Sequence, residues 1–309
     1  MDIRAISQAD VTPWAELMAA AFDRPQETMV QLWPWLQQGD GLLAWGAWDG
    51  ARLAAQYSCL LTSLWLPGTE EPARVGMSIN MAVHPDYRGQ GLIKQVSQPV
   101  YAALAALGGV AGVGFSNAAG VKVDRHSKGY GYQVVGQMQP HLVMLRRAPH
   151  ALPLSLTAVW PCQPWAFGAL PDERVRFRAT AVDVQRRFAQ HPFRRYQFGV
   201  WREGEEVCGV VVYRTLRRRG AALLAAYGAE MGELLRRWAT AVYQNGIRYI
   251  HCLTTPQAAL RPHLHALGPA MTLPWTRTPY FLTVKCLDEG IRPLLTDFGR
   301  WDCMGGDIL

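Results

Sequence analysis

The sequence has few charged residues and very little lysine. Asp, Glu, Lys and Arg make up 18% of the 309 residues, and only four of the 31 basic residues are lysines. Hydrophobic residues account for 50% of the chain. Such a composition excludes an intrinsically disordered protein, because enough apolar surface is available to form a core. It predicts a globular protein.

Cysteine is sparse, and the sequence gives no clear sign of a secretory signal or a membrane span. Its six cysteines have no close pairs, which argues against a disulfide framework and a zinc site. The first ten residues, MDIRAISQAD, contain no basic segment followed by an apolar run, so no secretory signal is evident. The longest uncharged stretch, Gln95 to Val121, contains Pro99 and fits a helix and a buried strand better than a membrane span. We therefore expect a cytoplasmic protein that does not enter a membrane.

The net charge of +7 is unevenly distributed over a length sufficient for two domains. Residues 1–150 hold 11 basic and 11 acidic residues, and residues 151–309 hold 20 and 13. Much of the excess comes from arginine runs at 186–187, 194–195, 217–219 and 236–237. We interpret these mainly as a solvated face, with a site for an anionic ligand or a cofactor phosphate as the second interpretation. Nucleic-acid binding is not expected, since no recognition motif accompanies the arginines.

One stretch, Met77 to Ile93 (MSINMAVHPDYRGQGLI), organises the first half. Its alternating pattern as far as Val83 predicts a strand, and helical spacing resumes at Leu92. The glycine-rich turn Arg88-Gly89-Gln90-Gly91 lies between them. Because a helix N-terminus exposes unpaired N–H groups, this arrangement is suited to hold a pyrophosphate. Taken alone, it is equally compatible with an ordinary tight turn.

The remaining first half alternates predicted helices and strands. We expect a strand at 2–6, a helix capped by Asp10 or Thr12, a second helix after Pro25 that breaks near Pro34, and hairpin strands at 42–48 and 53–66 joined by Asp49-Gly50. The helix after the glycine turn is expected to run to Leu107 with a bend at Pro99. A strand at 110–115, a helix at 118–128 and a last strand from Gly131 through 142–145 complete the series.

This order of elements resembles the GNAT superfamily of acetyl-CoA-dependent N-acyltransferases. Arg88 and Gly91 match the family's cofactor motif, although Ile93 stands where the family has a small residue. Asn117 follows the fifth strand, and the segment Gly131 to Gly136 (GYQVVG) resembles the family's closing motif. The resemblance implies a mixed α/β (α+β) sheet and a GNAT domain over residues 1–148.

The second half looks like a degenerate copy of the first. A hairpin through Glu203-Gly204 parallels that at Asp49-Gly50, and Gly246 and Gly268 repeat the 22-residue spacing of Gly109 and Gly131. We expect a strand at 247–253 and a helix capped by Thr255. The whole chain is thus interpreted as two tandem GNAT-like acyl-CoA N-acyltransferase domains. A proline-rich connector at 149–165 would precede a domain at 166–309 without the pyrophosphate turn, because Glu230 would repel phosphate there.

The resemblance also implies a site for acetyl-CoA as co-substrate. The backbone of Met81, Ala82 and Val83 would pair with the pantetheine arm, and the Val83 amide would polarise the thioester carbonyl. The amides of Arg88, Gly89, Gln90, Gly91, Leu92 and Ile93 would hold the pyrophosphate. Asn117 would contact pantetheine or a bound water. The acceptor, an amine of a small molecule or a peptide, would attack the thioester directly.

Acid–base residues are less evident. Ser127 occupies the position of a frequent family tyrosine, and His126 beside it has an ordinary pKa near working pH. Near the chain end, Asp302 and Asp307 are candidates to bind the amine or act as base, and a packed C-terminal strand is the simpler interpretation. His84 is interpreted as structural. No metal is expected, since His263 and His265 point to different helix faces.

Two alternatives to the N-acetyltransferase remain at this point. One is a non-catalytic CoA-binding or interaction protein, in which the absence of the family's usual Glu and Tyr reflects lost chemistry. The other is a peptide-bond former that uses aminoacyl-tRNA, but such proteins do not generally keep the CoA turn. The sequence leaves the acceptor, the length of the acyl group and the oligomeric state open, and an oligomer is compatible with it.

Overall fold

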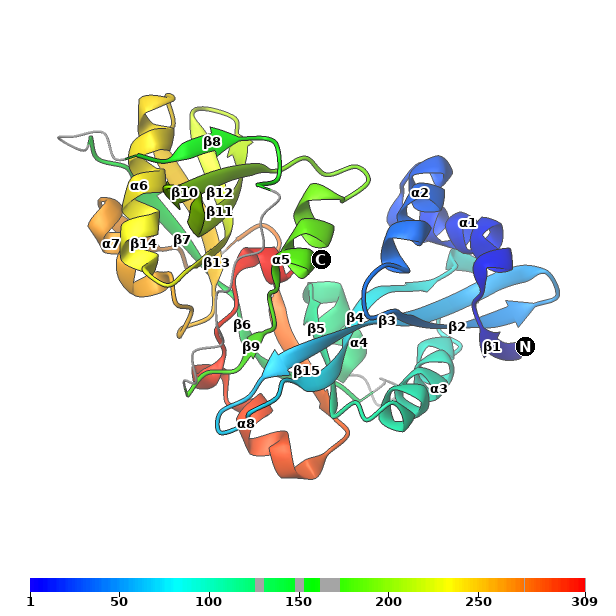
Figure 1. Cartoon of the computed structure of the whole chain (residues 1–309). Helices are drawn as coiled ribbons and strands as arrows, with labels where there is room; N and C mark the ends of the chain where they lie inside the picture. The colour runs from blue at the N-terminus through cyan, green and yellow to red at the C-terminus, as the bar shows by residue number, and fades with distance from the viewer. Residues whose placement is uncertain (126–130, 148–152, 162–172, 275, 309) are drawn as a thin grey trace. The chain divides into compact units, whose positions relative to one another are not determined.

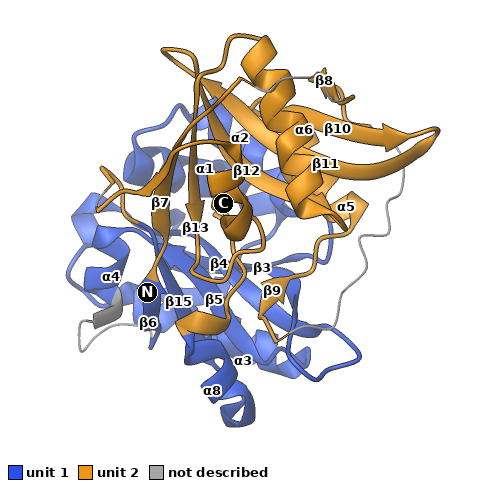
Figure 2. Cartoon of the chain, turned by 90° about the vertical axis from the view of Figure 1, so that its left-hand side faces the viewer, with its two compact units in different colours: residues 1–136, 280–297 blue, residues 137–279, 298–309 orange. Residues whose placement is uncertain are grey.

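The computed structural model describes residues 1–125, 131–147, 153–161, 173–274 and 276–308. The chain divides into two compact units (Figure 2). Unit 1 comprises residues 1–136 and 280–297, and unit 2 comprises residues 137–279 and 298–309. Neither unit is a continuous segment of sequence. No helix in the described ranges is both long and apolar enough to cross a membrane.

Unit 1 is a mixed sheet covered by helices on both faces (Figure 1). Its strands follow the order β1-β2-β3-β4-β5-β15-β6, and β4 and β5 are paired in parallel. The strands are β1 (Asp2–Ala5), β2 (Leu42–Asp49), β3 (Arg52–Trp65), β4 (Ala73–Val83), β5 (Ala111–Ser116), β6 (Gln133–Gln137) and β15 (Phe281–Cys286). The helices are α1 (Val11–Phe22), α2 (Gln26–Leu36), α3 (Leu92–Ala106), α4 (Ala118–Arg125) and α8 (Arg292–Thr296).

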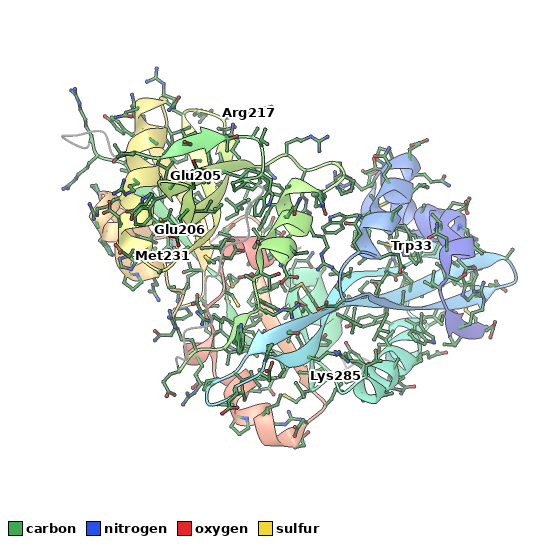
Figure 3. All side chains as sticks on the ribbon, in the orientation of Figure 1. Trp33, Glu205, Glu206, Arg217, Met231 and Lys285 are labelled. Atoms are coloured by element: carbon green, nitrogen blue, oxygen red, sulfur yellow. The ribbon has the colours of Figure 1, made fainter. Side chains whose placement is uncertain are left out.

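The sequence explains the layering of unit 1. Helices α1 and α2 lie over one face of the sheet and α3 over the other, so β3 is buried along nearly its whole length (Figure 1). The indole rings of Trp14 and Trp33 pack edge to face at 4.9 Å, and both side chains are almost completely buried. Figure 3 labels Trp33 within this helical layer. The burial of Trp33 places this tryptophan pair in the core of unit 1.

Unit 2 repeats this plan. Its strands follow the order β14-β7-β13-β12-β11-β10-β8, with β12 and β13 in parallel. They are β7 (Gln139–Met144), β8 (Ser155–Thr157), β10 (Gln197–Glu203), β11 (Glu206–Leu216), β12 (Gly220–Gly228), β13 (Tyr249–Thr254) and β14 (Ala270–Thr272), and a short strand β9 (Arg176–Phe177) also belongs to this unit. The helices are α5 (Ala181–Val184), which continues as a π-helical turn at Gln185–Ala189, α6 (Met231–Gln244) and α7 (Leu264–Leu267). Trp238 anchors α6 to the core on one face.

The two sheets exchange one strand each. In unit 1, β15 lies between β5 and β6, although it comes from the end of the sequence. In unit 2, β7 occupies the equivalent place between β13 and β14, although it directly follows β6 in the sequence. The two units therefore share a strand order but not a clean boundary. The expected division into residues 1–148 and 166–309 does not describe them, and the expected connector at 149–165 includes β8, a strand of unit 2.

Three local expectations are wrong in detail. The last strand expected from Gly131 to Leu145 is two strands, β6 and β7, which belong to different sheets. The second helix does not break at Pro34: α2 continues to Leu36, although Pro34 removes one N–H bond, that to the carbonyl four residues earlier. No helix starts at Thr255. Its hydroxyl instead donates to the carbonyl of Trp301 and accepts the Cys303 N–H, so it fixes the C-terminal segment.

The C-terminal segment is docked, as the sequence predicted. Trp301 is fully buried, and Met304 forms an isolated bridge with Thr254 of β13. A short 3₁₀ turn at Gly305–Asp307 follows, with Gly306 and Asp307 buried. The segment is a bridge and a turn, and its packing gives the tail a structural role within unit 2.

The strand exchange predicts that a mutation late in the sequence destabilises unit 1. Leu282 of β15 is fully buried beside β5. We expect Leu282→Ala to lower the free energy of unfolding by about 2–5 kcal/mol, as truncation of a buried leucine does. Hydrogen exchange should show the loss of protection in β5 and β6. Met271→Ala, at an exposed position of β14, should change stability by less than about 0.5 kcal/mol. Loss of protection confined to β13 and β14 would contradict the exchange.

Candidate functional site

An opening forms in unit 1 where β4 and β5 separate. Their parallel pairing covers Val75, Gly76 and Met77 and ends there. Further along β4, the register with β3 shifts and Asn80 has a positive φ of 52°, which marks a β-bulge. Asn is among the few residues that tolerate this left-handed conformation. The side chain of Gln56 donates a hydrogen bond to the Asn80 carbonyl and holds the bulge in place.

Beyond the bulge, β4 is bonded on one edge only. The His84 N–H donates to the Ala54 carbonyl of β3 at 2.8 Å. Since successive residues of a strand direct their backbone groups to opposite edges, the Val83 N–H is directed to the other edge, where β5 has already diverged. Alternate backbone groups of Met81 to Val83 are thus directed to the opening, and their pairing with a pantetheine arm stays a prediction.

The turn after β4 positions the start of α3. Gly89 and Gly91 have φ values of 80° and 72°, a region that favours glycine, and Gly91 is the residue before the first turn of α3. An added Cβ at Gly89 would meet no atom within 4 Å, so the space beside the turn is open. The first turn of α3 contains no acidic residue and includes the exposed Lys94. Its unpaired N–H groups and the helix dipole therefore favour an anion.

Contacts outside the opening fix the start of this turn. The Asp86 N–H donates to the His84 ring at 3.3 Å, and Arg52 of β3 forms an ion pair with Asp86 at 3.2 Å. The Tyr87 hydroxyl donates to Asp49 at 2.7 Å across the β2–β3 hairpin. His84 is thus held in a structural role, as expected. These exposed contacts orient the turn more than they stabilise the protein.

A cluster of buried hydroxyl groups lies beneath the opening. The Tyr57 hydroxyl of β3 is within hydrogen-bond distance of the hydroxyl groups of Ser78 (2.8 Å), Tyr132 (3.3 Å) and Tyr101 of α3, and it can donate to one of them at a time. The ammonium of Lys285 on β15 lies 4.1 Å from the centre of the Tyr101 ring, on the α3 side (Figure 3). Burial raises the pKa of Tyr101 and Tyr132 and lowers that of Lys285.

Asn117 has a local structural role. Its side-chain carbonyl accepts the Gly120 N–H at 2.9 Å, and its backbone carbonyl accepts the Val121 N–H at 2.9 Å. Asn117 therefore caps α4 immediately after β5. Its exposed amide group retains N–H donors, so a contact with pantetheine stays a prediction.

Asp307 is a buried carboxyl of unit 2. It accepts the Met304 N–H at 2.7 Å within the last 3₁₀ turn. Burial raises the pKa of Asp307 to about 6, and the positive charge of Arg187 opposes this rise. Asp302, by contrast, accepts the Ala259 N–H at 2.9 Å and forms an ion pair with Arg174 at 3.3 Å, which gives it a structural role in unit 2.

The other predicted residues are distributed as follows. His126 and Ser127 lie outside the described residues. Within the described ranges, no group of three or more His, Cys, Asp or Glu side chains is arranged to hold a metal ion. The second-half turn has Glu230 immediately before α6 and Glu233 in its first turn, and a Cβ at Gly232 would approach the ring of His263 to 2.9 Å. This turn is acidic and closely packed.

Sequence reasoning did not find three features of the site. The bulge at Asn80 depends on a register shift that no local motif announces. The hydroxyl cluster joins Tyr57, Tyr101 and Tyr132, which are separated by up to 75 residues. Lys94 was available as a signal, because a lysine in the first turn of a helix runs against the usual preference for acidic residues there.

Asp307 predicts a specific dependence of stability on pH. Its folded pKa of about 6 is above the unfolded value, so the folded state binds the proton more tightly. The stability that it contributes is complete below about pH 4 and is lost as pH rises to 6. The difference in unfolding free energy between the wild type and Asp307→Asn should fall by about 1–3 kcal/mol over this range in urea titrations. Parallel curves for the two proteins would contradict it.

Comparison with known proteins agrees with this architecture. A family model described as an acetyltransferase (GNAT) domain matches residues 2–132. A probable N-acyltransferase from Enterococcus faecalis has a TM-score of 0.68 and 12% identity, over 93% of this chain and 73% of that one. A GCN5-related N-acetyltransferase from Kribbella flavida has a TM-score of 0.66 and 14% identity, over 93% of this chain and 71% of that one. Eis1 from Mycobacterium abscessus has a TM-score of 0.59 and 15% identity, over 91% of this chain and 73% of that one.

A search of curated proteins by sequence finds no match. The structural neighbours are too distant in sequence to show more than the fold, but they extend over both units. The opening between β4 and β5 and the glycine turn before α3 lie within the segment that the family model matches. A family model described as an acetyltransferase (GNAT) domain thus matches residues 2–132, and the chain has the fold of the GNAT structures that it resembles.

Proposed function

We propose that the protein is an acetyl-CoA-dependent N-acetyltransferase, which moves an acetyl group to the amine of a small molecule or peptide by direct attack. The observation that carries this proposal is the geometry of unit 1. A strand with an unpaired edge, Met81 to Val83, leads through an open glycine turn to the N-terminus of α3. These are the groups that a thioester arm and a pyrophosphate require.

The residues present fit acetyl-CoA as co-substrate. The backbone N–H groups from Arg88 to Ile93 are the proposed pyrophosphate ligands, and Lys94 adds positive charge beside them. The space next to Gly89 is open to a bound group. Asn117 is the proposed amide donor to the pantetheine arm. When bound, acetyl-CoA supplies an activated acyl carbon and a thiolate leaving group.

The Val83 N–H is the proposed polariser of the thioester carbonyl. A backbone N–H fixed in a strand needs no reorganisation when negative charge develops on the oxygen in front of it. Gln56 and the bulge at Asn80 hold this part of β4 against β3, so the direction of the Val83 N–H is set before substrate binds. These residues position the donor and take no part in proton transfer.

Asp307, His126 and Ser127 are the proposed proton-transfer residues. A carboxyl with a pKa of about 6 is largely deprotonated at pH 7 and can accept a proton from an ammonium group, which leaves the neutral amine that attack requires. His126 has the side chain best suited to exchange protons near neutral pH. Ser127 would donate a hydrogen bond to the departing thiolate.

Release of free thiol tests the proposed reaction. We expect acetyl-CoA and a panel of amines, which includes amino acids, amino sugars and short peptides, to give thiol release above the hydrolytic background with at least one acceptor. Mass spectrometry should find the acceptor 42 Da heavier, about the mass of an added acetyl group. Calorimetric binding of acetyl-CoA without release with any acceptor would instead favour a non-catalytic CoA-binding protein.

A matched pair of glycine variants tests the site itself. Gly89 and Gly68 both have φ values near 75–80°, and neither has an atom within 4 Å of an added Cβ. Gly89→Asp and Gly68→Asp therefore introduce the same charge and similar backbone strain, at opposite ends of β4. We expect Gly89→Asp to weaken acetyl-CoA binding at least about tenfold, by repulsion of the pyrophosphate. Equal weakening in Gly68→Asp would overturn the proposed location.

The pH dependence of the reaction distinguishes the proton-transfer candidates. If Asp307 is the base, kcat/KM for the wild type should fall below about pH 6, and Asp307→Asn should lower it at least about 100-fold at pH 7 and remove this limb. His126→Ala and Ser127→Ala should have smaller effects in that case. A profile unchanged by Asp307→Asn would rule out Asp307 and leave His126 as the remaining titratable candidate.

A further inference from the structure

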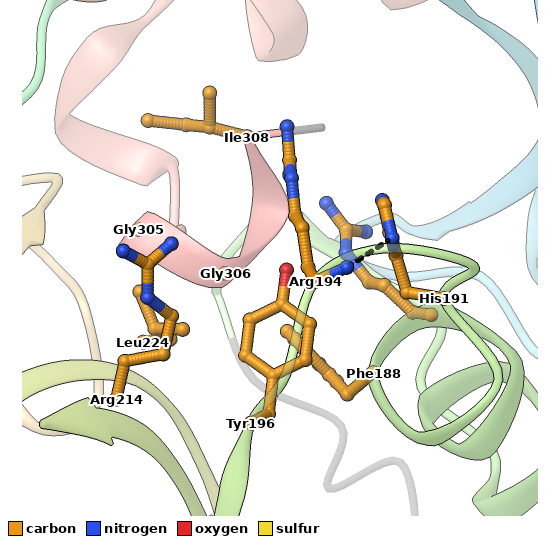
Figure 4. Close-up of a pocket in the computed structure, with 10 residues that line it drawn as sticks. Phe188, His191, Arg194, Tyr196, Arg214, Leu224, Gly305, Gly306 and Ile308 are labelled. Atoms are coloured by element: carbon orange, nitrogen blue, oxygen red, sulfur yellow. Dashed lines mark hydrogen bonds between the residues drawn. The ribbon is translucent and has the colours of Figure 1, made fainter. Parts of the chain in front are cut away.

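A pocket in unit 2 is lined by three arginines. Arg187 comes from the π-helical turn after α5, Arg194 from the segment before β10, and Arg214 from β11. The pocket has a volume of about 80 Å³, which is large enough for a phosphate or carboxylate group. Figure 4 shows Arg194 and Arg214 on either side of Tyr196. Arg187 and Arg194 belong to one segment of the sequence and Arg214 to a later strand, and the fold brings the three side chains to one cavity.

The positive charge of the pocket is not neutralised by ion pairs. Among the described residues, none of the three guanidinium groups has a carboxylate oxygen within 4 Å. Arg187 interacts electrostatically with the buried Asp307 but forms no ion pair with it. Its Nη2 atom is buried without a hydrogen-bond partner. A buried donor left unpaired is costly, so this arrangement favours an occupant that accepts hydrogen bonds.

The walls of the pocket are fixed. Phe188, next to Arg187, is one of the lining residues. A Cβ added at Gly306 would approach the Phe188 ring to 3.0 Å and the Leu224 carbonyl to 2.9 Å, so the wall is closely packed there. His191 is buried, and its Nδ1 accepts the Arg194 N–H at 3.1 Å, which orders the backbone that carries Arg194 (Figure 4). Burial and the nearby arginines lower the pKa of His191 to about 4, so it is neutral at pH 7.

We propose that this pocket binds the phosphate or carboxylate group of a small molecule. Guanidinium groups match the planar and bidentate geometry of both anions, and the Tyr196 hydroxyl is a further donor. The pocket is lined by residues of unit 2 alone.

Calorimetry with simple anions tests the proposal on the full chain. Inorganic phosphate, pyrophosphate and citrate are titrated separately at an ionic strength held constant with NaCl, which separates specific binding from screening. We expect saturable binding of at least one of them. The anion that binds with the lower dissociation constant shows whether the pocket prefers a phosphate or a carboxylate group. Absence of saturable binding for all three would overturn the proposal.

Matched variants locate the binding. Arg194→Gln and Arg214→Gln should each weaken it at least about tenfold, while Arg217→Gln should leave it within about twofold. Arg217 is an exposed arginine on the neighbouring β11–β12 hairpin (Figure 3), so its replacement removes the same charge from the same unit outside the pocket. Thermal unfolding without anion verifies that each variant is folded. Equal loss in Arg217→Gln would show general charge attraction and contradict a built site.

Discussion

The separation of β4 from β5 is the constraint on which the candidate site depends. Two parallel strands that stayed paired to their ends would leave no backbone group of β4 for a ligand. Pairing ends at Met77, and the bulge at Asn80 turns the rest of β4 away while Gln56 keeps it attached to β3. The same change of direction delivers the chain to the glycine turn and the N-terminus of α3. The unpaired edge of β4 and the N-terminus of α3, the two parts of the proposed cofactor site, therefore follow one another along a single segment.

The hydroxyl cluster explains how such an opening is supported from below. Tyr57, Tyr101 and Tyr132 come from three elements that meet where β4 and β5 are still paired. Their hydrogen bonds satisfy polar groups that would otherwise be buried at a cost. Glycine at 112 is required there, because a Cβ would approach the Tyr132 hydroxyl to 2.6 Å. The cluster thus joins β3, α3 and the chain before β6 under the site. Strand β15 covers it, because Lys285 lies over the ring of Tyr101.

Local signals in the sequence predicted much of the fold and little of its connectivity. The hairpin at Asp49-Gly50, the strand before Val83 and the helix after Gly91 follow from turn residues and periodicity, which act over a few residues. The exchange of β7 and β15 could not be predicted in this way. Either strand fits beside β5 by its own pattern, and the choice depends on contacts between distant segments. The same holds for the site: the glycine turn is local, whereas the bulge and the tyrosine cluster are not.

Comparison of the two units indicates why only one has a proposed cofactor site. Both place a helix after the fourth strand of the sheet, at Leu92 in unit 1 and at Met231 in unit 2. In unit 1 the turn is open and the first helical turn carries Lys94. In unit 2, Glu230 and Glu233 stand at the same point, and His263 fills the space beside Gly232. An anion would meet like charge and an occupied volume there. The anion site proposed for unit 2 is instead the pocket lined by Arg187, Arg194 and Arg214, so the sites proposed for the two units lie at different elements of the shared strand order.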